Sequence, residues 1–255
     1  MVVDFGKTAF DYAKHRAGFP DRFFDRLFKD GLVAEGNRVV DLGTGTGTIA
    51  RGLAQRSCAV TSVDISAALL GQARELDRNA GVEVRYVEAK AEQTGLPSHA
   101  FDAVTAGQCW HWFDRNQAAQ EARRLLVPKG RLIIAHFDWL PLPGNVVEAT
   151  EKLIGAHNPA WHWDGGTGIH SRWFADLSQN GFADIESFSF DVSAPYSREA
   201  WLGRIRASAG IAASLPPDAV ERFNAEHEEM LARNFPDAVL QIPHRVFAVF
   251  GRAAD

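Results

Sequence analysis

The stretch Val39-Val40-Asp41-Leu42-Gly43-Thr44-Gly45-Thr46-Gly47 decides the fold of this chain. Its first residues form a short, mostly apolar run that is typical of a buried strand. The glycines that follow let the backbone turn sharply and let a ligand approach it closely. Exposed backbone amides at the start of the next helix favour an anionic ligand group. The stretch therefore predicts a strand, a ligand-binding turn and a helix.

Short apolar runs and helical patterns alternate on both sides of this turn. Further runs that are typical of strands occupy residues 59–63, 82–87, 101–105 and 132–135. Strands that alternate with helices predict βαβ units, so we expect an α/β fold with a doubly wound, mostly parallel Rossmann-like sheet. Such sheets bind ligands beyond the carboxyl ends of their strands.

The second half of the chain is less regular and predicts helical cap insertions. We expect a single domain over residues 1–255. Its core sheet should occupy about 33–137, 183–193 and 243–252, and its cap segments about 138–170 and 195–240. The spacing of Asp218 and Glu221 predicts a capping box that begins a helix in the second cap segment.

Composition excludes several classes of protein. The 255 residues are 46% hydrophobic and 23% charged, which is typical of a globular chain and excludes a disordered or fibrous one. The net charge of −5 argues against a nucleic-acid partner. No uninterrupted apolar run could span a membrane, and the charged N-terminus does not resemble a signal peptide. Because the two cysteines, Cys58 and Cys109, form no CxxC pair, we expect a cytoplasmic protein; its oligomeric state stays open.

The glycine turn has a second interpretation. Gly45-x-Gly47-x-x-Ala50 matches the fingerprint of nicotinamide-dinucleotide enzymes, with Asp64 at a suitable distance to bind ribose hydroxyls. Asp41 argues against this interpretation, because dinucleotide-binding proteins usually keep an apolar residue there. A carboxylate at that position can instead support a cationic ligand group. An NAD(P)-dependent oxidoreductase therefore remains as an alternative.

Residues 39–50 (VVDLGTGTGTIA) resemble the glycine-rich motif of class I S-adenosylmethionine-dependent methyltransferases. The resemblance continues in order through residues 63–66 (VDIS), 87–92 (VEAKAE) and 107–114 (GQCWHWFD), the last being similar to the small-molecule, trans-aconitate-type branch. It implies S-adenosylmethionine as cofactor and methyl transfer to an oxygen, nitrogen or carbon atom of a small molecule. A non-catalytic protein that binds S-adenosylmethionine is a further alternative, which turnover would exclude.

The resemblance also implies which residues hold the cofactor. They are Asp41, Gly43, Gly45, Gly47, Asp64, Ile65, Ala91, Glu92, Gln108, Tyr12 and Arg16. Asp64 would accept hydrogen bonds from both ribose hydroxyls, and Ile65 beside it would pack on the adenine. Because Asp64 is expected at a strand end, its replacement should barely change the folded state. Lys90 departs from the family pattern, since a lysine cannot accept a hydrogen bond from the adenine amino group.

His111 is the candidate catalytic residue. It follows the fourth predicted strand at the ligand-binding edge, and the ordinary histidine pKa of about 6.5 suits a general base near neutrality. A carboxylate acceptor would need no base. In a separate alternative, His111 is only a packed residue between two tryptophans. The nearest cluster of possible metal ligands is His162, Asp164 and His170, whose spacing matches no metal motif, so we expect no metal site.

Overall fold

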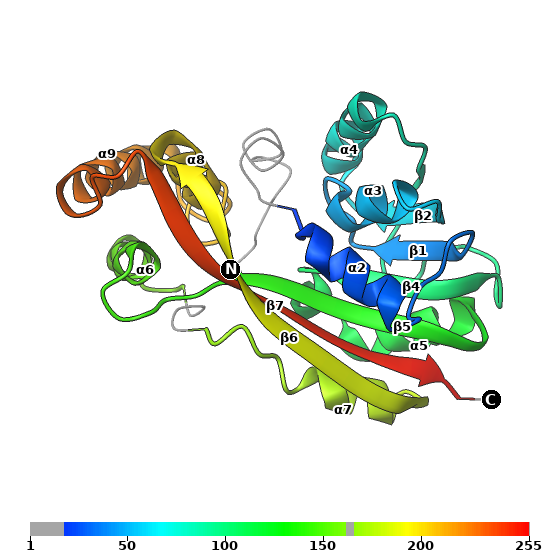
Figure 1. Ribbon diagram of the computed structural model, residues 1–255. Helices are drawn as coiled ribbons and strands as arrows, with labels where there is room; N and C mark the ends of the chain where they lie inside the picture. The colour runs from blue at the N-terminus through cyan, green and yellow to red at the C-terminus, as the bar shows by residue number, and fades with distance from the viewer. Residues whose placement is uncertain (1–17, 162–165, 255) are drawn as a thin grey trace. The chain divides into compact units, whose positions relative to one another are not determined.

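The computed structural model describes residues 18–161 and 166–254, and its central element is a mostly parallel sheet of seven strands (Figure 1). In chain order the strands are β1 (Arg38–Leu42), β2 (Ala59–Asp64), β3 (Arg85–Glu88), β4 (Phe101–Gly107), β5 (Leu126–Trp139), β6 (Phe182–Ser197) and β7 (Val239–Ala253). Their order across the sheet is β3-β2-β1-β4-β5-β7-β6. The doubly wound α/β architecture expected from the sequence is therefore confirmed.

Helices flank the sheet and connect most of its strands. They are α2 (Asp21–Lys29), α3 (Thr48–Ala54), α4 (Ala67–Ala80), the short 3-10 helix η2 (Trp110–Trp112), α5 (Arg115–Leu125), α6 (Val146–His157), α7 (Trp173–Gln179), α8 (Arg198–Arg206) and α9 (Pro217–Asn234). Central strand β1 is apolar on both faces because both are covered: Val39, Val40 and Leu42 are fully buried.

Strand register determines where a ligand can bind. β1 pairs in parallel with β2 on one side and with β4 on the other, so Asp41 lies beside Ser62 and Thr105. The strand order reverses between β1 and β4, because β2 and β3 extend the sheet one way and β5 the other. Open α/β sheets bind ligands at such a switch point, beyond the carboxyl ends of the strands. The glycine turn after β1 is at this place.

Several elements have other bounds than the sequence-based expectation, and the starts of β3 and α9 have clear physical reasons. β3 begins at Arg85 and not at residue 82, because this edge strand pairs with β2 only from Arg85 to Glu88. The predicted capping box at Asp218 is wrong, since α9 begins at Pro217 after the N-cap Pro216. A proline at the first helical position has no amide to satisfy and has its φ already set for the helix. The carboxylate of Asp218 instead accepts a hydrogen bond from Arg222, one turn along α9.

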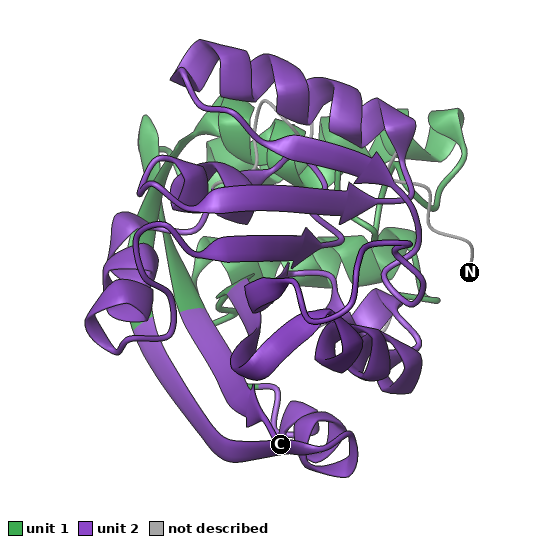
Figure 2. Cartoon of the chain, turned by 90° about the vertical axis from the view of Figure 1, so that its right-hand side faces the viewer, with its two compact units in different colours: residues 1–17, 138–169, 191–245 green, residues 18–137, 170–190, 246–255 purple. Residues whose placement is uncertain are grey.

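The chain forms two compact units, shown in Figure 2. Unit 2 comprises residues 18–137, 170–190 and 246–254, and it contains β1 to β4 with the glycine turn. Unit 1 comprises the described residues of 138–169 and 191–245. It has its own apolar core, in which Val147 of α6, Trp201 of α8 and Phe223 of α9 are fully buried. Three of the divisions fall inside β5, β6 and β7, and another lies between residues 169 and 170.

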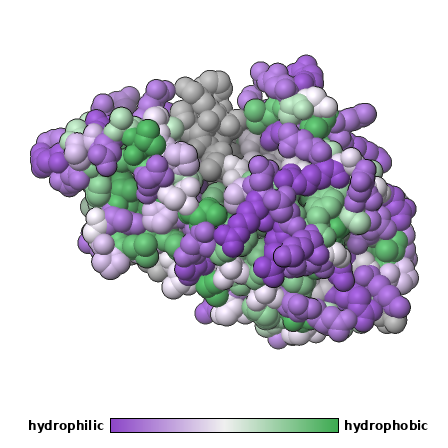
Figure 3. Space-filling view, viewed as in Figure 1, coloured by the Kyte–Doolittle hydropathy of each residue, from purple (hydrophilic) through white to green (hydrophobic). Residues whose placement is uncertain are grey.

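No helix among the described residues is long and apolar enough to cross a membrane. On the face drawn in Figure 3, hydrophobic residues gather in separate patches among hydrophilic ones. Single exposed apolar side chains such as Ile65, Leu142 and Val239 are ordinary on a protein surface.

Candidate functional site

The glycines after β1 adopt a backbone conformation that favours glycine. Gly43, Gly45 and Gly47 have φ values of +60°, +57° and +77°. A Cβ atom on Gly43 would lie only 2.9 Å from Sγ of Cys109 and 2.7 Å from Cζ of Phe113. A Cβ atom on Gly45 would meet nothing within 4 Å. Gly43 is thus required by its neighbours, whereas Gly45 leaves open space in which a ligand can approach the backbone.

Asp41 is a buried carboxylate at the end of β1, with only 2% of its surface exposed. It accepts hydrogen bonds from the hydroxyls of Thr44 and Thr105, both at 2.6 Å. Burial raises its pKa to about 6, against the opposing effect of these hydrogen bonds, and the nearby charge of Asp64 adds to the rise. The folded protein therefore holds a costly negative charge beside the turn, which a cationic ligand group would stabilise.

Asp64 connects the ends of β1 and β2. Its Oδ2 atom accepts a hydrogen bond from the amide of Gly45 at 2.8 Å, and its Oδ1 atom accepts one from the amide of Ser66 at 2.9 Å. Burial raises its pKa, and these amides partly oppose the rise. Asp64 therefore has a structural role that the sequence did not reveal. Each oxygen keeps a further lone pair for a ligand hydroxyl, and Ile65 beside it is 70% exposed.

Three further residues that were predicted to contact the cofactor interact with other parts of the protein. Ala91 is buried, with 4% of its surface exposed. Glu92 accepts a hydrogen bond from the backbone amide of Asp114 at 2.9 Å, and the Gln108 side chain donates one to the carbonyl of Phe137 at 3.1 Å. Glu92 and Gln108 therefore also hold neighbouring loops in position. Tyr12 and Arg16 lie outside the described residues, so their roles stay predictions.

His111 belongs to a row of aromatic rings at the carboxyl ends of β4 and β5. Its ring centroid lies 4.7 Å from that of Trp112 and 5.3 Å from that of His136. The His136 ring lies 4.6 Å from His170, which stacks on Trp173 at 4.1 Å. Sequence spacing singled out His111, but its histidine neighbours come from β5 and from the segment before α7.

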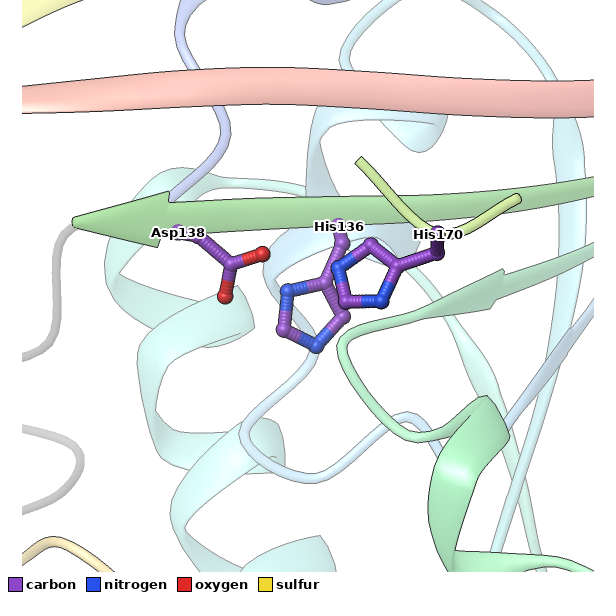
Figure 4. Close-up of side chains that lie close together, drawn as sticks. All are labelled: His136, Asp138 and His170. Carbon is purple, nitrogen blue, oxygen red and sulfur yellow. The ribbon is translucent and has the colours of Figure 1, made fainter. Parts of the chain in front are cut away.

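The side chains that the structure brings together as possible metal ligands differ from those that are nearest in the sequence. The sequence places His162 and Asp164 nearest to His170, and both lie outside the described residues. The structure instead brings His136 and Asp138 to His170, with their ligand atoms within 4.8 Å of one another (Figure 4). His136 and Asp138 are two residues apart on β5 and therefore lie on one face of the strand. That alternation is the signal from which the sequence could have predicted this pair.

A pocket in unit 2 lies away from these residues. It is lined by His99, Arg123 and Asn180 among others, and by the first residues of β5. These positions are at the amino end of β5, whereas the glycine turn follows the carboxyl end of β1. Because none of the predicted site residues lines this pocket, it is not the candidate site.

Comparison with known proteins finds similar methyltransferases and solved structures of the same fold. Residues 40–134 match the model of a family described as a methyltransferase domain. An uncharacterized methyltransferase of Mycobacterium tuberculosis is 34% identical over 132 residues, 52% of this chain and 51% of the relative. The chain thus matches about half the length of this relative. A malonyl-[acyl-carrier protein] O-methyltransferase of Geobacter sulfurreducens is 31% identical over 194 residues, 71% of this chain and 67% of the relative. The YcgJ protein of Bacillus subtilis shares the fold, with a TM-score of 0.60 and 20% identity over 92% of this chain and all of that one.

Proposed function

Because this chain belongs to the class I S-adenosylmethionine-dependent methyltransferases, we propose that it transfers a methyl group from S-adenosylmethionine to a small-molecule acceptor. The observation that carries the proposal is the arrangement of Asp41 and Asp64 around the open space at Gly45. The cofactor supplies a methyl group that is already electrophilic. The protein therefore has to align the acceptor with that methyl group and exclude water.

The residues of the turn fit the parts of this cofactor. Gly45 allows close approach to the backbone, and the buried charge of Asp41 suits a cationic group. The remaining lone pairs of Asp64 can accept hydrogen bonds from two adjacent hydroxyls, and exposed Ile65 offers an apolar surface to a base. The rest of the proposed set is Gly43, Gly47, Ala91, Glu92 and Gln108, with Tyr12 and Arg16 outside the described residues.

His111 is the proposed general base for acceptors that must lose a proton. It follows β4, the strand at the switch point of the sheet, and it is partly exposed. A hydroxyl, an amine or an activated carbon atom would transfer its proton to the imidazole as the new bond forms. An ionised carboxylate acceptor would need no such step. Whether His111 acts as a base thus depends on the class of acceptor.

Cofactor identity is tested by thermal denaturation with a panel of ligands. S-adenosylmethionine and S-adenosylhomocysteine should raise the melting temperature by mass action, while NAD and NADP should not. A rise with NAD alone would support the oxidoreductase alternative. An acceptor screen that follows release of S-adenosylhomocysteine then separates an enzyme from a non-catalytic binding protein, which would bind the cofactor without turnover.

The base is tested once an acceptor is known. His111→Ala should lower turnover roughly 10²–10⁴-fold and leave cofactor affinity nearly unchanged. His99→Asn is the matched control, because His99 lies at the amino end of β5 in the same unit. If His111→Ala and wild type agree within about threefold, the general-base role is refuted, since that difference is far below the expected one.

We also propose a cytoplasmic location and a small-molecule partner. Cys58 and Cys109 are both buried and are not joined in a disulfide, which supports a reducing compartment. The net charge of −5 is unfavourable for binding a nucleic-acid backbone. Fractionation of cells followed by immunodetection of the protein would test the location.

A further inference from the structure

We propose that His136, Asp138 and His170 form a binding site for a divalent transition-metal ion such as Zn²⁺. Together they offer two imidazole nitrogens and one carboxylate oxygen, and these ligand atoms lie within 4.8 Å of one another (Figure 4). Imidazole and carboxylate donors suit Zn²⁺ and neighbouring first-row ions better than Mg²⁺ or Ca²⁺. The proposal does not depend on methyl transfer, because it is argued from these three donor side chains alone.

Strand β5 positions two of the three donors. Its last pairing with β4 joins Gly107 to Ala135, so His136 and Asp138 lie just beyond β4 on the extension of the strand. Residues two apart on a strand project to the same side, which brings the imidazole and the carboxylate together. Both ring nitrogens of His136 are buried although the residue as a whole is only partly buried, and Asp138 is partly exposed. The strand therefore fixes the spacing of this pair, with one donor in the interior and one towards the surface.

Stacking on Trp173 orients the third donor. The His170 and Trp173 rings are nearly parallel, with an interplanar angle of 8° and a centroid distance of 4.1 Å. Trp173 is itself only 3% exposed, so the surface on which His170 stacks is part of the core. The His170 ring lies 4.6 Å from the His136 ring. A ligand whose orientation is held by packing is preorganised for metal binding.

The spacing of the donors fits a small cation. A tetrahedral zinc ion about 2.1 Å from each ligand atom needs those atoms about 3.4 Å apart. The ligand atoms lie within 4.8 Å of one another, so binding a zinc ion would draw each of them inward by on the order of 1 Å through small side-chain rotations. Three protein ligands leave a fourth position open, as in zinc sites that bind water or substrate. Because Asp138 and His170 are partly exposed, we expect that position to take an oxygen atom of water, a carboxylate or a hydroxyl.

The competing explanation is a structural role for Asp138. Its negative charge acts on the buried guanidinium of Arg204, so the carboxylate could serve only to balance that charge. The two explanations differ in what happens when His170 loses its nitrogens. A metal site would lose affinity for zinc, whereas a charge balance between Asp138 and Arg204 would not involve His170.

The experiment measures Zn²⁺ binding to the full chain after treatment with a chelator. Titration calorimetry should give one bound zinc ion per chain, and Co²⁺ should give the visible absorption of a low-coordinate site. His170→Phe keeps a ring on Trp173 but removes both nitrogens, and it should weaken zinc binding more than roughly 100-fold, the upper loss for a merely supporting residue. His157→Phe is the matched control, because His157 also packs on an aromatic ring, Phe223, and is not one of the three proposed ligands.

Asp138→Asn is the second variant, because it removes the charge and keeps the shape. We expect at least a roughly tenfold loss of zinc affinity, with unchanged circular dichroism. The proposal is overturned if the wild-type chain binds no stoichiometric zinc, or if His170→Phe and Asp138→Asn both keep wild-type affinity. Binding of S-adenosylhomocysteine, measured on the same samples, reports separately on the cofactor site.

Discussion

Replacing Asp41 with Asn should stabilise the protein without cofactor and weaken its binding of cofactor. The side chain is 2% exposed, and burial disfavours its charged form. Asn has nearly the same shape and carries no charge. The substitution therefore separates the electrostatic contribution of Asp41 from its packing.

The magnitude follows from the pKa. Burial raises it from 3.8 to about 6, and each whole step of pKa corresponds to 1.36 kcal/mol, so the ionised carboxylate lowers stability by about 3 kcal/mol at neutral pH. Thr44 and Thr105 each donate a hydrogen bond to the carboxylate, and Asn cannot accept both as well. A weakened hydrogen bond removes about 1–2 kcal/mol of the gain. We therefore expect Asp41→Asn to raise the free energy of unfolding by about 1–2 kcal/mol at pH 7.

The sign of the pH dependence gives a sharper test. Between pH 3.8 and about 6 the folded state binds more protons at Asp41 than the unfolded state does, so this group lowers stability as pH rises. Denaturant unfolding of wild type and Asp41→Asn from pH 4 to 8 should show a difference that grows up to about pH 6 and then stays constant. Asp25→Asn is the control, because 70% of the Asp25 side chain is exposed. Its substitution should have little effect at any pH.

Two results would refute this reasoning. Asp41→Asn could be less stable than wild type at every pH, which would mean that the hydrogen bonds from Thr44 and Thr105 outweigh the burial of charge. Alternatively, the difference between the two proteins could be independent of pH, which would mean that Asp41 titrates normally in the folded state. Calorimetry with S-adenosylmethionine on the same samples checks the second half of the prediction, and undiminished affinity would remove Asp41 from the cofactor site.

Three further predictions follow from described contacts. Asp64→Ala should weaken cofactor binding by about 1–3 kcal/mol, which calorimetry measures. It should also lower the melting temperature in thermal denaturation, because the Gly45 and Ser66 amides lose their acceptor. Gly43→Ala should lower the melting temperature more than Gly45→Ala, since both incur left-handed strain of roughly 1–2 kcal/mol but only Gly43 gains a clash; equal losses would contradict this. Burial lowers the pKa of His227 from 6.5 to about 4. Between these pH values the unfolded state binds more protons at His227 than the folded state does, so the free energy of unfolding should fall by about 3 kcal/mol as pH falls from 6.5 to about 4. Denaturation of His227→Gln should show a smaller acid loss, and an unchanged pH profile would exclude this residue as its source.

The alternation of strands and helices along the chain and the glycine turn were predictable because their signals are local. A buried strand needs a run of apolar residues, and a turn such as that at Gly45 needs glycine, wherever the rest of the chain lies. The start of α9 was also a local question, but Asp218 was the wrong choice because the preceding prolines set the helix start more strongly.

The row of histidines was not predictable in the same way. His170 meets His136 only because the segment before α7 returns to the sheet, and no pattern within either segment encodes that return. The contact between Asp64 and the amide of Gly45 was hidden for a related reason. It depends on where the turn after β1 passes the end of β2, and not on the residues that surround Asp64 in the sequence.

The position of the donors on the extension of β5 has an evolutionary consequence. The family match ends at residue 134, just before His136, while Asp41 and Asp64 lie within it. Inherited changes beyond that point can accumulate without disturbing the glycine turn, because the two sets of residues occupy different strands. A lineage could in this way acquire new ligands one substitution at a time and keep the ancestral turn throughout.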